Sequence, residues 1–310
     1  MKKAIFASLF LIGFTTTNLH AELIGEWTFD NQNLKDSSNF RAAGTHDGQG
    51  SASRIKYVKR GGRYGVQFIN QGGRTGYIQI KNSSNRIYGS QSGSIGNKVN
   101  ATYQDTFDDH IFGSNGTKQM SVSFLAKGIP GGWNPFISKK GDGDNEGNKG
   151  WQVRPAGDGN RAGNSTYTYT IRNNGVDSDP RSQKAENKIS NFDRDAWHHY
   201  AFVWDGKAQT ISIYVDGQRL LHKTGYNITN FNMAKGNYLT FGGRDINNNM
   251  GNSTTENMSM DQIRIYSHAI NQAKINSLKA ELNAPEPCTI GLLALGGTAL
   301  LARRRRRKNA

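Results

Sequence analysis

The sequence predicts an all-β protein folded as a sandwich of two antiparallel sheets, and three observations lead to this class. Short segments that alternate apolar and polar residues recur along the chain, and turn formers separate them, including 37 glycines. The chain holds 14 Phe, 12 Tyr and 5 Trp, which is enough aromatic material to fill a sandwich core. The one cysteine, Cys288, cannot form a disulfide within the chain, so the core has to stabilise the fold.

A series of segments has the composition and alternation expected of β-strands. In chain order they are Ile24–Phe29, Tyr64–Phe68, Tyr77–Ile80, Met120–Ala126, Phe136–Lys139, Trp151–Arg154, Thr166–Arg172, Trp197–Trp204, Thr210–Val215, Tyr238–Phe241 and Met258–Tyr266. The polar stretches 82–118 and 175–195 stay unassigned, as long loops or as extra strands.

The clearest local signal is a hairpin pair between residues 197 and 221. Tyr200, Phe202 and Trp204 share one face of a strand, and the chain then turns at Asp205-Gly206. The returning strand also alternates, and it ends in a second turn, Asp216-Gly217. Period-two alternation around Asp-Gly pairs is typical of antiparallel hairpins.

A short helix closes the body of the protein. Asn271 is suited to cap its first turn, since its side chain can accept a backbone hydrogen bond. Ile275, Leu278 and Leu282 follow at helical spacing and form an apolar stripe.

The first 21 residues are expected to be a signal peptide. Lys2 and Lys3 precede an apolar run, and the segment ends in the small residue Ala21, after which we expect cleavage. The alternative is an uncut membrane anchor, but the apolar run is short for a membrane span.

Residues 283–310 form a three-part tail. Pro285, Glu286 and Pro287 precede the apolar stretch Cys288–Ala302, and Arg303, Arg304, Arg305, Arg306 and Arg307 follow it together with Lys308. As a helix the apolar stretch covers about 22 Å, short of the roughly 30 Å hydrocarbon core, although arginines can snorkel to reach the interface. The basic cluster should stay on the cytoplasmic side of the membrane.

This tail resembles the PEP-CTERM sorting signal of Gram-negative bacteria. The resemblance implies a transient anchor in the inner membrane and processing by exosortase, a membrane-embedded sorting enzyme. The protein would then reach the cell surface or the extracellular matrix. The alternative is a plain C-terminal membrane anchor.

The formal net charge of +15 is unevenly distributed along the chain. Setting aside the +2 of Lys2 and Lys3 and the +6 of the tail leaves +7 on the body. A moderately basic body favours anionic polymers such as acidic glycans. The body shows no zinc-finger spacing, RNA-binding aromatic signature or basic helix, so we do not expect it to bind nucleic acid.

The body, residues 22–282, resembles the LamG-like, concanavalin A-like family of jelly rolls. The strings 196–206 (AWHHYAFVWDG) and 213–217 (IYVDG) are similar to the central hairpin of that family, and 261–266 (DQIRIY) to its closing strand. The segments 27–30, 36–38 and 44–48 are similar to its opening. The resemblance implies a jelly-roll sandwich of two curved antiparallel sheets, closed by the short helix after the last strand. The hydrophobic helix expected at the C-terminus belongs to the tail.

A structural calcium ion is expected where the first and last strands meet. If these strands pair antiparallel, the carboxylates of Asp30 and Asp261 come together and repel each other unless a cation joins them. Asn31 and Asp36 can add the oxygen ligands that calcium prefers. The family resemblance also implies a calcium ion in many members. The alternative is two solvated turn aspartates.

Two other patterns do not predict a metal site. The segment 142–147 resembles the start of an EF-hand loop, but Val153 stands where the loop needs its last acidic ligand. Adjacent strand residues point to opposite faces, so His198 and His199 are not expected to share a metal ion.

We expect a binding protein and no enzyme. The sequence has neither the Glu-x-Asp-x-x-Glu spacing of glycosidases with this fold nor a Gly-x-Ser-x-Gly motif. Trp133 lies in a glycine-rich loop where it could stack on a sugar, and Tyr167 and Tyr169 share one strand face. The predicted function is binding of carbohydrate or another envelope polymer. The alternatives are a structural matrix protein without a ligand and a glycoside hydrolase with an unfamiliar site.

Overall fold

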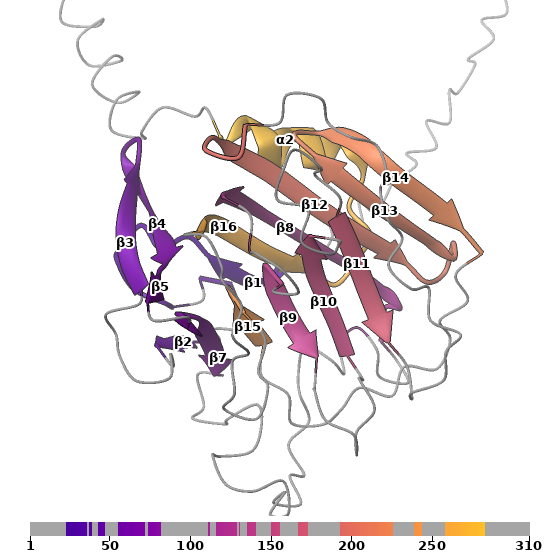
Figure 1. The fold of residues 1–310 in the computed structure, drawn as a ribbon. Helices are drawn as coiled ribbons and strands as arrows, with labels where there is room; N and C mark the ends of the chain where they lie inside the picture. Colours follow the sequence, from indigo (N-terminus) through magenta and orange to yellow (C-terminus); the bar gives the residue numbers. More distant parts are fainter. Residues whose placement is uncertain are drawn as a thin grey trace, which may run out of the picture.

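A computed structural model shows a sandwich of two antiparallel sheets packed face to face, as the sequence predicted (Figure 1). It describes residues 23–35, 37–38, 43–46, 55–71, 74–81, 111, 116–128, 130, 135–140, 150–155, 167–172, 193–225, 239–243 and 258–282. The leader predicted at 1–21, most of the polar stretches 82–118 and 175–195, and the tail 283–310 lie outside these residues.

The larger sheet has eight strands. Across the sheet they are β14 (Gln218–Thr224), β13 (Thr210–Val215), β12 (Trp197–Asp205), β8 (Gln119–Lys127), β16 (Met258–Tyr266), β4 (Arg63–Phe68) and β3 (Ile55–Arg60), with β1 (Leu23–Trp27) also paired to β16. The strand β16 therefore has two partners on one side: its first residues pair with β4 and its last residues with β1. The predicted antiparallel pairing of the first and last strands is confirmed.

The smaller sheet has six strands. Across the sheet they are β11 (Tyr167–Arg172), β10 (Gly150–Pro155), β9 (Ile137–Lys140), β15 (Leu239–Phe241), β7 (Ile78–Lys81) and β2 (Ala43–His46). A separate pair, β5 (Asn70–Gln71) with β6 (Arg74–Thr75), forms a short two-stranded ribbon.

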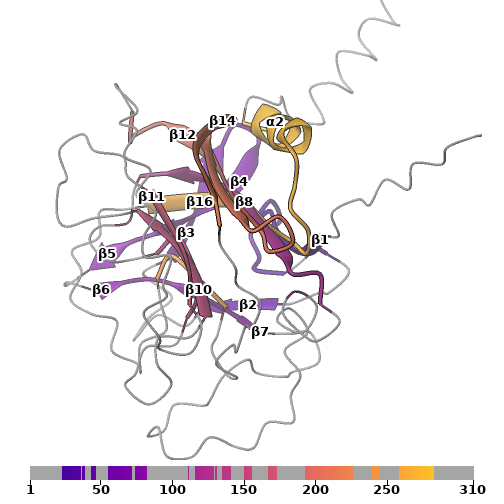
Figure 2. The same ribbon diagram turned by 90° about the vertical axis from the view of Figure 1, so that its right-hand side faces the viewer.

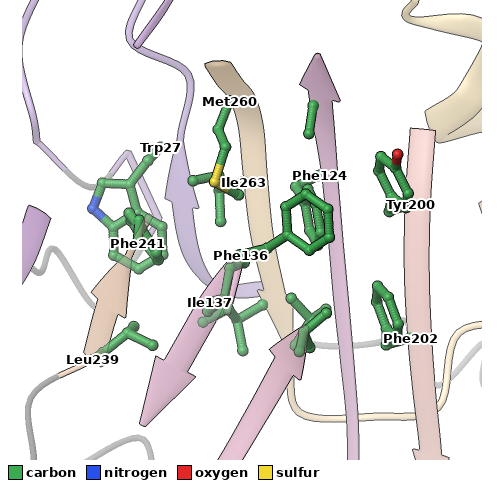
Figure 3. Packing of buried hydrophobic residues seen from close by; sticks show 14 of the residues in the cluster. Trp27, Phe124, Phe136, Ile137, Tyr200, Phe202, Leu239, Phe241, Met260 and Ile263 are labelled. Atoms are coloured by element: carbon green, nitrogen blue, oxygen red, sulfur yellow. The ribbon is translucent and has the colours of Figure 1, made fainter. Parts of the chain in front are cut away.

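The core lies between the two sheets and is rich in aromatic rings (Figure 3). The ring of Phe124 on β8 stacks on Tyr200 of the neighbouring β12, with centroids 5.2 Å apart, and packs against Phe136 at 5.1 Å. At the other side of the core, Trp27 meets Phe241 edge to face at 4.9 Å. Each such side chain contributes on the order of 1.5–3 kcal/mol when it is buried, so these contacts hold the two sheets together.

The helix α2 (Gln272–Ala280) packs on the outer face of the eight-stranded sheet, away from the other sheet (Figure 2). Asn271 caps it as predicted, since its Oδ1 accepts the Lys274 N–H at 2.9 Å. Ile275 and Leu278 are buried against the sheet, whereas Leu282 of the predicted stripe lies past the helix end. Among the described residues, no helix is both long and apolar enough to cross a bilayer.

Candidate functional site

A β-bulge in the middle of β16 determines where its charged side chains lie. The register against β8 shifts between Asp261 and Arg264, and Gln262 within the bulge has a φ of 50°. Asp261 is then paired with Leu125, and Arg264 with Ser123. Both partners alternate with core residues of β8, so the two charged side chains lie on the outer face of the eight-stranded sheet.

Asp261 is completely buried, and its counter-charge is Arg60 on β3. Arg60 Nε donates to Asp261 Oδ2 at 2.6 Å, and Asp261 Oδ1 accepts the Gln262 N–H at 2.7 Å. Burial raises the pKa of the Asp261 carboxyl to about 7, against the opposing effect of the Arg60 charge. The guanidinium of Arg60 also lies over the ring of Trp197, 5.7 Å from the centroid.

The residues of the predicted calcium site come only partly together. Asp30 follows β1 and lies near enough for its charge to raise the pKa of Asp261, and its Oδ1 accepts the Tyr64 N–H at 3.3 Å. Asn31 is exposed, and Asp36 lies outside the described residues.

The observed pairing does not suit calcium at Asp261. The guanidinium of Arg60 supplies the positive charge that was expected from a calcium ion, and it would repel a second cation. In the part of the chain that the structure describes, no three His, Cys, Asp or Glu side chains are grouped to hold a metal. The calcium site remains a prediction.

A second arginine, the partly buried Arg264, joins the first strand, the last strand and the end of α2. Its Nε donates to Glu26 Oε1 of β1 at 2.7 Å, and its Nη2 donates to Gln262 Oε1 at 2.7 Å. It also binds both carboxylate oxygens of Glu281 at 3.0 and 2.9 Å. Ser37 donates to the second oxygen of Glu26 at 2.7 Å. The sequence does not predict this network, because the alternation of β16 does not reveal the bulge that forms it.

The two adjacent histidines of β12 have different environments, as strand alternation predicts. His199 is buried with its Nε2 2.9 Å from Ser123 Oγ, and burial lowers its pKa to about 4. His198 has an acceptor at each ring nitrogen, with Nδ1 2.6 Å from Asp216 Oδ2 and Nε2 2.7 Å from the Asp193 carbonyl oxygen. Burial alone would lower the pKa of His198, but these two acceptors outweigh it and raise the pKa.

Of the residues predicted to bind a ligand, two lie in a described strand. Tyr167 and Tyr169 belong to β11, the edge strand of the smaller sheet, where the register pairs them with Pro155 and Val153 of β10. Trp133 lies outside the described residues. The contacts that the structure describes do not show whether any of these three residues binds a ligand.

A row of polar side chains crosses the face of the smaller sheet that points away from the core. Each alternates with buried apolar residues of the core, and each is itself buried. In register, Gln152 of β10 lies opposite Ser138 of β9, and Ser138 lies opposite Thr240 of β15. Arg154 lies on the same face, two residues beyond Gln152.

The hydrogen-bonding capacity of this row is only partly used. Thr240 Oγ1 donates to backbone carbonyls, with Gly243 O at 2.6 Å. Ser138 Oγ and Gln152 Oε1 are shielded from solvent and have no hydrogen-bond partner among the residues that the structure describes. Buried polar atoms without partners are uncommon in folded proteins, because each costs free energy. In the sequence each of these polar residues directly follows an apolar residue of a predicted strand, but the burial of the polar side chain cannot be read from that pattern.

The two-sheet jelly roll with its outer helix defines the class of protein, and the sequence defines the family. The pattern of the concanavalin A-like lectin/glucanases superfamily matches residues 100–276, more than half of the chain. The chain belongs to this superfamily. No curated protein sequence matches it.

Solved structures with this fold include carbohydrate-associated domains. Domain 4 of AbnA, an extracellular arabinanase from Geobacillus stearothermophilus, was solved in complex with arabinotriose. It is 19% identical, with a TM-score of 0.53 over 84% of this chain and 98% of the domain. The binding domain of botulinum neurotoxin serotype D/C is 15% identical with a TM-score of 0.55. This chain spans only 52% of that domain's length, although 84% of the chain is covered. At these identities the likeness shows the fold alone.

Proposed function

We propose that this chain is an exported, non-catalytic module that binds carbohydrate or another envelope polymer. Its membership in the lectin/glucanases superfamily carries the proposal. The arabinanase domain with bound arabinotriose gives a precedent for saccharide binding on this fold. A second comes from botulinum neurotoxin type C, whose cell entry depends on interaction with two ganglioside molecules.

The non-catalytic part of the proposal rests on the state of the carboxylates. Glycoside hydrolysis uses two carboxyl groups that face the substrate, one of them able to give a proton. Among the described carboxylates, Glu26 and Glu281 are both bound to Arg264, and the fully buried Asp261 is bound to Arg60. These contacts suit structural ion pairs that tie strands together.

Export and sorting complete the proposal and rest on the sequence. The leader 1–21 would direct secretion, and the tail with Pro285-Glu286-Pro287 and Arg303–Arg307 would hold the protein in the inner membrane until exosortase acts on it. Expression in Gram-negative cells with and without exosortase tests this part. We expect a shortened, released product only in cells that contain the enzyme, and release of the same product from both strains would contradict it.

A glycan array probed with the purified chain tests the binding. The array should include arabinans, β-glucans and acidic exopolysaccharides, and it should be probed with and without calcium. We expect saturable binding to at least one polysaccharide class, and the heat-unfolded chain is the control. Uniform background signal, together with retention of the protein in extracellular polymer, would instead support a structural matrix protein. Release of reducing sugar from any array member would contradict the non-catalytic assignment.

A further inference from the structure

We propose that the outer face of the eight-stranded sheet binds an acidic polysaccharide, a linear polymer of uronic acids, along a row of side chains that begins at Trp197 and ends at Lys56. This inference rests on the proposed function and gives it a location and a ligand class. Three features of the row carry it: its register across five strands, its exposure to solvent and its charge.

The row is continuous because each of its residues is paired directly with the next. Across the sheet, from β12 to β3, its members are Trp197, Lys127, Ser259, Gln67 and Lys56. The chain neighbours Ala126, Val66 and Ile55 belong to the core, so strand alternation turns the row outward. With strands about 4.7–4.9 Å apart, the four steps of the row span about 19 Å, which is the length of several sugar units.

Solvent reaches this row. Lys127 and Lys56 are exposed, Trp197 and Gln67 are partly exposed, and Ser259 retains 6% exposure between them. The helix α2 covers a different part of the same face, where it packs with Ala201 and Val203 further along β12. Within the described part of the chain, the row is therefore accessible from outside the sandwich.

The indole of Trp197 lies along the sheet and can serve as a stacking platform. Its Cη2 lies 3.0 Å from the position of a Cβ added at Gly65, although β8 and β16 separate β12 from the β4 strand of Gly65. The side chain therefore extends across these strands. The Arg60 guanidinium lies 5.7 Å from the ring centroid, which holds the ring in place while part of its surface stays exposed. The apolar face of a sugar ring stacks on such an aromatic surface.

The charge of the row selects an acidic polymer. Its two lysines are three strands apart, about 14 Å, and hydroxyl and amide groups lie between them. Asp261, two residues along β16 from Ser259, is buried and paired with Arg60, so it does not oppose an anion. The exposed Asp195 precedes Trp197 by two residues, so the tryptophan end is not cationic. Carboxylates of the polymer would therefore bind at the lysines, and an uncharged part of a sugar at Trp197.

The test compares an acidic polysaccharide with its neutral form. We would titrate the purified full chain with polygalacturonate and with fully methyl-esterified polygalacturonate, which has the same backbone without the charge. We expect saturable binding of the acidic form only, and weaker binding as salt is added. Lys127→Gln and Lys56→Gln should each weaken it about threefold, the effect of one exposed ion pair. Trp197→Leu should weaken it about fivefold, because it removes the stacking surface.

The matched control is Lys223→Gln, which removes the same charge from an exposed position on β14, outside the row. It should leave polygalacturonate binding unchanged, and all three lysine variants should keep the wild-type melting temperature because these side chains are exposed.

The outcomes separate this inference from the proposed function. If the wild-type chain binds neither polygalacturonate nor any member of the glycan array, the proposed function fails and this inference with it. If the wild type binds only neutral polysaccharides, or if the Lys127 and Lys56 variants bind polygalacturonate as well as the Lys223 variant does, only this inference is wrong. Equally tight binding of polyglutamate would also overturn it, because the row would then recognise charge without the sugar.

Discussion

Replacing Arg264 by Leu should be among the most destabilising single changes on the outer face of the eight-stranded sheet. The guanidinium binds Glu26 of β1, Glu281 after α2 and Gln262 of its own strand, so it connects β1, β16 and the end of α2. Leu fills much of the same volume but leaves two carboxylates without their counter-charge.

The magnitude follows from how much water reaches these carboxylates. Breaking a fully buried ion pair from one side costs about 3–5 kcal/mol. The side chains of Glu26 and Glu281 retain 20% and 27% of their exposure, so solvent recovers part of that cost. We therefore expect Arg264→Leu to lower the free energy of unfolding by about 2–4 kcal/mol.

Urea unfolding measures this loss by linear extrapolation. The matched control is Arg219→Leu, since Arg219 is exposed on the edge strand β14 and should change the free energy of unfolding by no more than about 0.5 kcal/mol. Adding Glu26→Gln to Arg264→Leu should restore part of the loss, because it removes one of the two stranded charges. A loss below about 1 kcal/mol for Arg264→Leu, equal to that of the control, would refute the assigned role of this network.

Three further outcomes follow from the structure. His198→Gln should destabilise the protein most below about pH 6.5 and progressively less at higher pH. The pKa of His198 is raised in the folded state, so the charged imidazole stabilises the fold, and this contribution disappears as the pH rises through the folded-state pKa. Denaturant midpoints between pH 5 and 9 measure the effect, and a difference that does not depend on pH would contradict it. Gly242→Ala should lower the melting temperature strongly, since Gly242 has a φ of 78° and an added Cβ would lie 2.5 Å from the Phe68 ring. The control is Gly225→Ala, where the backbone strain is similar at a φ of 86° but an added Cβ meets open space, so the melting temperature should fall less. Millimolar calcium followed by excess EDTA should leave the melting temperature unchanged, because Arg60 already neutralises Asp261; a calcium-dependent rise that Asp30→Asn abolishes would support the predicted calcium site instead.

The parts of the fold that the sequence predicted well are those whose pattern and burial agree. The predicted strand Met258–Tyr266 matches β16, and the turn at Asp216-Gly217 has positive φ at both residues, as a tight hairpin turn requires. The edge strands β3 and β14 were missed. In β3 only Ile55 is buried, and β14 is mostly exposed, so neither has the half-buried alternation that identifies a strand.

The candidate site was less predictable because it depends on pairing between distant strands. The proximity of Asp30 and Asp261 was inferred from the pairing of the first and last strands. The counter-charge of Asp261, however, comes from Arg60 on β3, a strand that the sequence did not reveal. The alignment of Ser138 with Gln152 depends on the register between β9 and β10. Register and bulges are set by packing across the whole sheet, and a single strand's pattern does not record them.

Arg60 also determines how the folded body would respond to tension. Its Nη1 donates to the carbonyl oxygens of Glu281 and Leu282, at 3.4 and 3.3 Å, in the last turn after α2. A pull on the chain beyond Leu282 would therefore act on β3 and β16 through this guanidinium before it could unwind the helix. Such an arrangement suits a folded domain that is pulled from its C-terminal end, because the force is distributed over hydrogen-bonded strands that would have to shear together.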